Sequence, residues 1–75
     1  MMETLEDIAS GILGIPAKEL KDSLVRRETA EWDSFNHLML VSEIEKKLGI
    51  QFTMADVEKV ETYGDLKALV DKKRQ

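Results

Sequence analysis

The sequence has no cysteine, one histidine, one proline and four glycines among its 75 residues. Without cysteine the chain cannot form disulfides, thiolate nucleophiles, iron–sulfur clusters or cysteine-ligated zinc sites. A single histidine also argues against a transition-metal site. The small number of glycine and proline residues argues against an all-β fold, which needs frequent turns.

Long hydrophobic runs are also missing, since no apolar stretch approaches the ~20 residues that a membrane span needs. The first residues, Met-Met-Glu-Thr-Leu-Glu-Asp, are acidic, unlike a signal or transit peptide. The net charge of −4 argues against nucleic-acid binding and suits a partner with a basic docking surface. We therefore expect a single domain over residues 1–75 that is cytoplasmic and monomeric.

The sequence does contain helical hydrophobic periodicity in four places, which predicts an all-α, four-helix bundle with three longer helices and one short helix. The spacing predicts the first helix over about 3–13 and the second from 33 or 34 to about 48. A short third helix follows position 53, and the last helix ends at about 72. Residues 15–32 then form a long loop between helices 1 and 2, and such a loop is more often functional than idle.

Capping residues mark the predicted helix ends. Asp33 is a favoured N-cap, and Gly49 suits the left-handed stop of the second helix. The pairs Thr53/Asp56 and Thr62/Asp65 have the capping-box spacing. In the long loop, apolar residues are spaced to hold the chain against the core, whereas positions 26–31 look solvent-facing. These apolar loop residues are Leu20, Leu24 and Val25.

Ser34 and His37 are the first candidates for catalysis, because residues three apart are neighbours on a helix and a Ser–His pair can act as nucleophile and base. An exposed helix start would not exclude water, no acid is placed to orient the imidazole, and the domain is too small for a substrate pocket with an oxyanion hole. We interpret His37 as a surface residue and Ser34 as part of the capping region, and expect no enzymatic activity.

The second predicted helix carries more apolar residues than one buried face requires. Leu40, Val41, Ile44 and Leu48 fit the inward set. The remaining three, Phe35, Leu38 and Met39, lie on the flank beside Ser34 and suggest a docking patch for a partner. The pattern alone slightly favours the alternative, that Met39 is an ordinary scattered surface hydrophobe.

The context of Ser34 resembles the acyl carrier protein family, in which an Asp-Ser-Leu motif opens the second helix. The resemblance is strongest from about residue 31 to 70, and the chain length and first helix fit it as well. The residues that carry it are Trp32-Asp33-Ser34-Phe35, Leu38, Leu40-Val41, Ile44-Glu45, Leu48-Gly49-Ile50 and Phe52.

This resemblance implies a role for each site residue. Ser34 would carry a covalent 4′-phosphopantetheine arm taken from coenzyme A by a phosphopantetheinyl transferase, and Asp33 would help that transferase to engage the site. The thiol of the arm would hold an acyl group as a thioester for acyl-loading and acyl-transfer enzymes. In the family, the acyl chain can fold back among the helices. The matching lining is Leu40, Ile44, Val57, Val60, Tyr63 and Leu66.

The sequence departs from the family pattern on the second helix. Fatty-acid-synthesis carriers have an acid-rich second helix, whereas residues 33–53 hold three acids and two bases here, and Phe35 replaces the usual leucine. This favours a specialised, stand-alone carrier in a lipid or secondary-metabolite pathway. An aminoacyl or peptidyl carrier, and a helical interaction adaptor that is never modified, stay open as alternatives.

Overall fold

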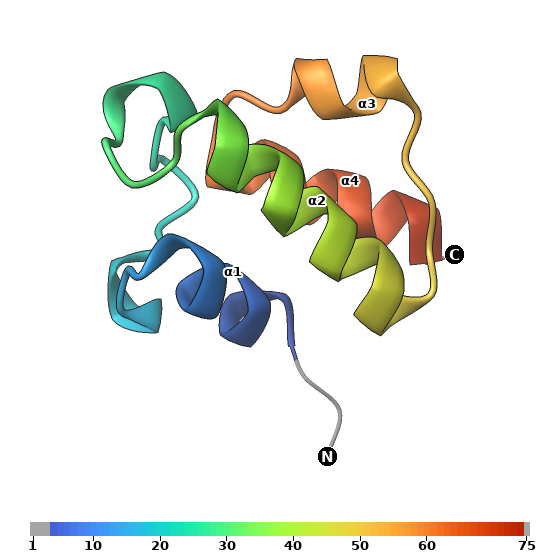
Figure 1. The fold of residues 1–75 in the computed structure, drawn as a ribbon, viewed down its shortest axis with the longest axis horizontal. Coiled ribbons are helices and arrows are strands. Elements are labelled where there is room, and N and C mark those ends of the chain that lie inside the picture. The colour runs from blue at the N-terminus through green and yellow to red at the C-terminus, as the bar shows by residue number, and fades with distance from the viewer. Residues whose placement is uncertain (1–3, 75) are drawn as a thin grey trace.

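The computed structural model describes residues 4–74, which contain four α-helices and two short 3₁₀ helices (Figure 1). The predicted all-α, four-helix architecture is confirmed. The first helix begins at Leu5, and Glu3 lies outside the described residues; the last helix extends to Arg74. The elements are α1 Leu5–Leu13, η1 Ala17–Glu19, η2 Arg26–Glu28, α2 Ser34–Leu48, α3 Met54–Lys59 and α4 Tyr63–Arg74.

Side chains cap all four helix starts, and for α2, α3 and α4 these are the caps that the local sequence predicts. The carboxylate of Asp33 accepts a hydrogen bond of 2.8 Å from the backbone N–H of Asn36. A reciprocal Thr–Asp pair opens each of the other three α-helices. These pairs are Thr4/Asp7, Thr53/Asp56 and Thr62/Asp65. Gly49 ends α2 in the left-handed region, at a φ of 67°, as predicted.

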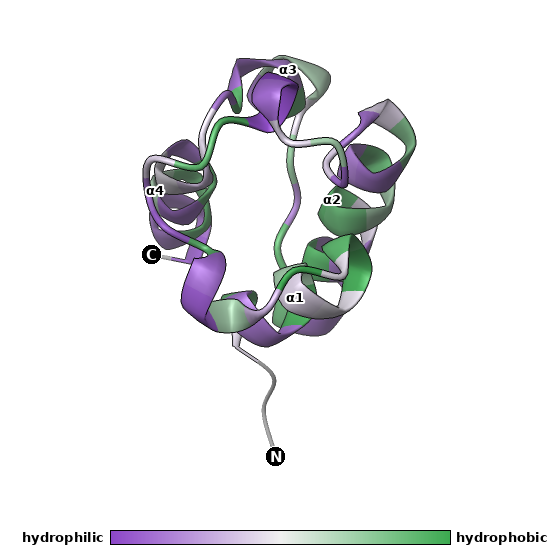
Figure 2. Cartoon of the chain, turned by 90° about the vertical axis from the view of Figure 1, so that its left-hand side faces the viewer, coloured by the Kyte–Doolittle hydropathy of each residue, from purple (hydrophilic) through white to green (hydrophobic). Residues whose placement is uncertain are grey.

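The helices pack around one hydrophobic core. Figure 2 shows long hydrophobic stretches on α1 and α2, whereas most of α3 and α4 is hydrophilic. Leu40 and Ile44 of α2 and Leu66 of α4 are fully buried, as the helical spacing predicts. Trp32 is also buried, although it precedes α2 and belongs to the long connection. The core therefore includes the chain segment that leads directly into Ser34.

The connection between α1 and α2 is more ordered than its composition indicates. It contains η1 and η2, and Val25 forms an isolated antiparallel bridge with Thr62 at the start of α4. The backbone N–H of Arg26 donates to the carbonyl of Glu61 at 2.7 Å. The prediction that position 26 faces solvent is wrong, because this bridge brings Arg26 against the body of the protein, where it is half-buried.

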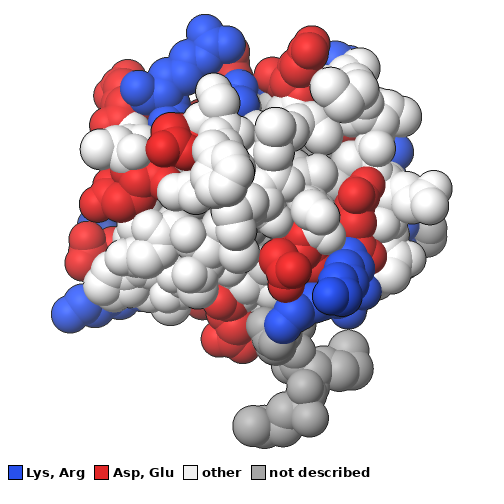
Figure 3. All heavy atoms as spheres, in the orientation of Figure 1, with Lys and Arg blue, Asp and Glu red and all other residues white. Residues whose placement is uncertain are grey.

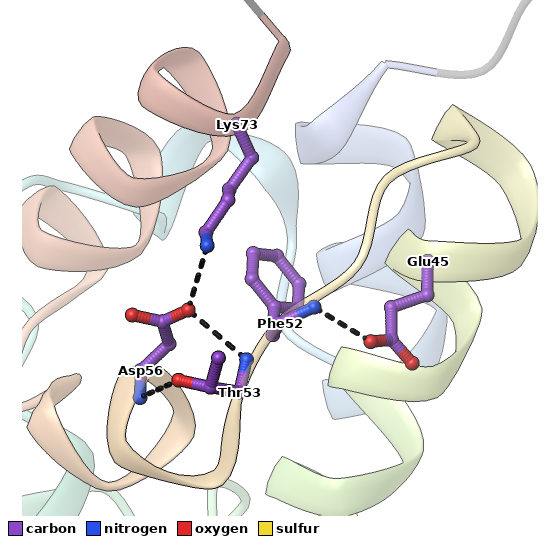
Figure 4. Close-up of polar contacts among 5 residues, drawn as sticks. All are labelled: Glu45, Phe52, Thr53, Asp56 and Lys73. Carbon is purple, nitrogen blue, oxygen red and sulfur yellow. Dashed lines mark hydrogen bonds and ion pairs between the residues drawn. The ribbon is translucent and has the colours of Figure 1, made fainter.

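The connection between α2 and α3 is held from both sides (Figure 4). The carboxylate of Glu45 on α2 accepts a hydrogen bond of 2.8 Å from the backbone N–H of Phe52. Asp56 accepts from the backbone N–H of Thr53 and forms an ion pair of 2.9 Å with Lys73 of α4. The Thr53 N–H and the Lys73 ammonium lower the pKa of Asp56 to about 2. These contacts fix the position of α3 relative to α2 and α4.

Candidate functional site

Ser34 is the first residue of α2, and its side chain is exposed. The N-cap function belongs to Asp33, so the Ser34 hydroxyl is not needed to satisfy the helix start. The Asn36 side chain donates to the carbonyl of Glu31 at 2.8 Å and closes the turn that leads into the helix. This geometry presents a serine hydroxyl on the surface, at a hydrogen-bonded helix start, where another protein can reach it.

Two open hollows border Ser34 in the surface. The first has a volume of about 500 Å³ and the second about 440 Å³. Arg26, Arg27 and Ser34 line both hollows. The other lining residues of the first are Thr29, Ala30, Trp32 and Asp33, and those of the second are His37, Leu38, Met54, Val57 and Glu58. Ser34 therefore lies between two recesses that share a pair of arginines.

The residues around Ser34 fit a phosphate group. Neither Arg26 nor Arg27 forms an ion pair with any of the residues 4–74. The Nε atom of Arg26 is buried and has no hydrogen-bond acceptor among the described residues. The dipole at the start of α2 also favours negative charge beside Ser34. A phosphodiester on the Ser34 oxygen would thus meet two unpaired cations and the positive end of a helix.

His37 is buried, with only 2 % of its surface exposed, so its interpretation as a surface residue is wrong. The Nε1–H of Trp32 donates to His37 Nδ1 at 3.0 Å, and His37 Nε2 lies 2.9 Å from the carbonyl of Val57. Because the indole nitrogen can only donate, Nδ1 must be the acceptor. The ring proton is then on Nε2, which donates a hydrogen bond to the carbonyl of Val57. The imidazole thus connects three segments, which are the residues that lead into α2, α2 itself and α3.

The hydrogen bonds of His37 also decide the question of a catalytic pair. A general base for Ser34 needs a free imidazole nitrogen within hydrogen-bond reach. Both ring nitrogens are already engaged, one by Trp32 and one by Val57. His37 acts here as a structural residue and not as a base for Ser34.

Burial makes the stability of this link depend on pH. Desolvation is the main cause that lowers the pKa of His37 below its usual 6.5, while the Val57 carbonyl opposes the shift and nearby Arg26 adds to it. Below about pH 6.5 the unfolded chain therefore binds more protons than the folded chain. The neutral, buried imidazole therefore makes its full contribution to the free energy of unfolding above that pH. This contribution is lost as the pH falls toward the lower pKa of the folded state.

We expect the free energy of unfolding to fall as the pH drops from about 7.5 to about 5.5, with a slope of at most about 1.4 kcal/mol per pH unit from this one proton. The His37→Gln variant should show a smaller slope, because it has no imidazole to protonate. Urea denaturation at both pH values measures the difference. Equal slopes in the two proteins would show that His37 protonates as easily in the folded chain as in the unfolded one.

Large hydrophobic side chains are exposed along α2 after Ser34 and at the start of α3. Phe35 is 69 % exposed, Leu38 56 % and Met39 40 %, so all three members of the predicted docking patch reach the surface. Met54, at the first position of α3, is 69 % exposed and lines a hollow together with Ser34 and Leu38. Figure 3 shows a broad uncharged surface on the face that carries α2. The sequence did not reveal Met54 as part of this surface, because it is 20 positions from Ser34.

All six residues predicted to line an acyl chain are buried. Val57 is the one that also lines a hollow beside Ser34. Val60 lines a different hollow, of about 280 Å³, between α3 and α4. The remaining four, Leu40, Ile44, Tyr63 and Leu66, are at most 1 % exposed and belong to the packed core. Their contact with an acyl chain stays a prediction.

Two other kinds of site are not found in the part of the chain that the structure describes. No group of three or more His, Cys, Asp or Glu residues among positions 4–74 is arranged to hold a metal ion. None of the helices in this range has the length and apolar character needed to cross a membrane.

Comparisons with known proteins agree on one family. The sequence pattern of the phosphopantetheine attachment site matches residues 3–70. The chain is 30 % identical over 69 residues to a protein named acyl carrier protein from Saccharopolyspora erythraea, covering 92 % of this chain and 73 % of the relative. It is also similar to the solution structure of holo acyl carrier protein from Geobacter metallireducens. The TM-score is 0.81 at 29 % identity, over 92 % of this chain and 79 % of the other.

Proposed function

Because the chain belongs to the phosphopantetheine attachment site family and is an acyl carrier protein by its relatives and its fold, we propose that Ser34 carries the prosthetic arm. The observation that supports this assignment is the position of Ser34, an exposed hydroxyl at the first residue of α2 whose helix start is capped by another residue. By contrast, the Ser10 hydroxyl donates to the carbonyl of Ile15 at 2.6 Å.

Each neighbouring feature has a part in this function. When bound, the arm supplies a thiol that holds an acyl group as a thioester, which the cysteine-free chain cannot do itself. The start of α2 stabilises the negative charge of the phosphodiester on Ser34. Asp33 holds the helix start in place and, as the residue before Ser34, would assist the transferase. The domain presents the cargo and leaves the chemistry to its partners, so we propose no catalytic role for its own residues.

Incubation with coenzyme A and a broad-specificity phosphopantetheinyl transferase tests the assignment. Intact-mass measurement should show the addition of one arm, and fragmentation should place it on Ser34. Addition at Ser10, Ser23 or Ser42 would move the site, and an unmodified chain would contradict a carrier function.

We propose that the partners are a phosphopantetheinyl transferase, an acyl-loading enzyme and an acyl-transfer enzyme of a specialised pathway. The name of the Saccharopolyspora relative favours an acyl cargo over an aminoacyl or peptidyl one. The docking surface consists of Phe35, Leu38 and Met39, and Met54 is added because it lines a hollow together with Ser34 and Leu38. Cytoplasmic location and a monomeric state stay predictions.

The apolar character of this surface predicts how partners recognise it. Of the two acids on the later part of α2, Glu45 is occupied by the Phe52 N–H, and Glu43 lies 3.9 Å from Lys47. Little unpaired negative charge is left for a partner to read. Burying Met39 in a partner pocket is worth about 1.5–3 kcal/mol, whereas an exposed charge contributes about 0–1 kcal/mol.

We therefore expect Met39→Ala to slow acyl transfer to the native partner by more than Glu43→Gln does. Glu43 is the matched control because it lies one turn further along α2 and leaves the Phe52 contact intact. Transfer rates measured over a salt series separate the two effects, since screening weakens charge-based docking. A steep loss of rate with salt, together with a neutral Met39→Ala, would show that recognition is electrostatic.

A further inference from the structure

Arg26 and Arg27 are the part of the site that neither the helix pattern nor the carrier function explains. They belong to η2, in the connection before α2, and yet both border the two hollows beside Ser34. No carboxylate of the described residues pairs with either guanidinium. Two arginines without counter-charges thus lie next to the one residue that is proposed to receive a phosphodiester.

Backbone contacts of the fold hold Arg26 in its position. Its backbone N–H donates to Glu61, next to the bridge between Val25 and Thr62, and this holds the start of η2 against α4. The side chain is half-buried, with its Nε atom cut off from solvent and unpaired. A guanidinium that is partly desolvated and lacks a counter-charge is unfavourable, and an anionic group beside its accessible part would offset this cost.

The chemistry of a guanidinium matches the group that Ser34 would receive. Arginine stays charged at all physiological pH values and presents several N–H donors in a planar fork that suits phosphate oxygens. A phosphodiester keeps two non-bridging oxygens that accept such bonds. The partner that fits this arginine pair is therefore a phosphate that is tethered at Ser34.

We propose that Arg26 and Arg27 form a phosphate-binding subsite for the arm on Ser34 and direct the arm into the hollow between α2 and α3. This inference depends on the attachment at Ser34 proposed above. Each hollow contains one carboxylate, Asp33 or Glu58, so the acids do not distinguish the two directions. The apolar lining does, because Leu38, Met54 and Val57 of the second hollow suit the uncharged part of the arm.

The first test compares the modified and unmodified forms of one protein. Wild-type chain carrying the arm should melt at a higher temperature than the unmodified chain, because the bound phosphate stabilises only the folded state. The double variant Arg26→Gln/Arg27→Gln should lose most of this difference. Arg74→Gln, which removes an exposed arginine from the last turn of α4, is the matched control and should keep it. If the double variant does not fold, Arg27→Gln alone, at an exposed position, should still reduce the difference.

The second test uses the absence of cysteine, which makes the thiol of the arm the only thiol in the protein. A nitroxide spin label attached to that thiol should broaden the amide signals of α3 several-fold more than those of η1, which lies away from α3 (Figure 1). In the double variant this contrast should disappear. Equal broadening of both elements in the wild-type protein would overturn the proposed direction of the arm.

The outcomes of these tests separate the two proposals. Absence of a mass increase on wild-type protein would contradict attachment itself. A complete mass increase, with the same melting difference and the same broadening in wild type and double variant, would contradict the arginine subsite alone. Loss of both effects in the double variant, with both kept in Arg74→Gln, supports the subsite.

Discussion

Replacing Ser34 with alanine is expected to abolish attachment of phosphopantetheine while leaving the fold intact. The variant lacks only the hydroxyl oxygen that would form the bond to phosphorus, so no residual modification is expected. The side chain is exposed, and Asp33 rather than Ser34 caps the helix. The change in the free energy of unfolding should therefore stay within about 0.5 kcal/mol, as for other surface substitutions.

Ser42→Ala is the matched control for this experiment. Ser42 is an exposed serine on the same helix, eight positions further along and away from its start. Intact mass should show that the Ser42→Ala variant is modified as completely as the wild-type protein. Circular dichroism should show the same helix content in the wild type and in both variants. Any arm found on the Ser34→Ala variant would show that another hydroxyl is the attachment residue.

The sequence predicts the helices well because their start and stop signals are local. Thr53 and Asp56 are three residues apart and bond to each other, so their spacing in the sequence directly predicts the contact. The same holds for Thr62 with Asp65. Gly49 ends α2 because left-handed backbone favours glycine. The motif around Ser34 is equally local, which is why its exposure at the start of α2 follows from the sequence.

Contacts between distant segments are what the sequence does not predict. His37 looks like a surface residue at a helix start, yet one of its partners is Val57, 20 positions away on another helix. Such a contact depends on how α3 is placed, which Glu45 and Lys73 set through their bonds to Phe52 and Asp56. Trp32 could have served as a signal, since tryptophan side chains are highly buried on average.

Arg26 illustrates the same limit at the candidate site. A run of charged residues in a loop is normally solvated, and positions 26–31 were expected to face solvent for that reason. The bridge between Val25 and Thr62 joins segments 37 positions apart and fixes Arg26 beside Ser34 instead. Only the tertiary structure brings the arginines and the serine together, so the proposed phosphate subsite could not be predicted from spacing.

Trp32→Ala is expected to be the most destabilising single change near the site. Truncating a buried tryptophan costs about 3–5 kcal/mol through lost packing and the cavity that is left. Trp32 is 1 % exposed, and its removal also leaves the buried Nδ1 of His37 without its donor. A domain of this size has a total stability at the low end of about 5–15 kcal/mol. We therefore expect the variant to be largely unfolded at room temperature.

Two further variants separate the causes of this loss. Phe35→Ala removes an aromatic ring only three positions away that is 69 % exposed, and should change the stability by less than about 0.5 kcal/mol. Trp32→Phe keeps most of the buried ring but not the indole N–H, so it should cost an intermediate amount, about 1–3 kcal/mol for the unpaired imidazole nitrogen. Urea denaturation followed by circular dichroism gives all three values. If Trp32→Ala and Phe35→Ala unfold at the same urea concentration, the tryptophan does not anchor the segment before Ser34, and the rigid presentation of that serine has no support from the core.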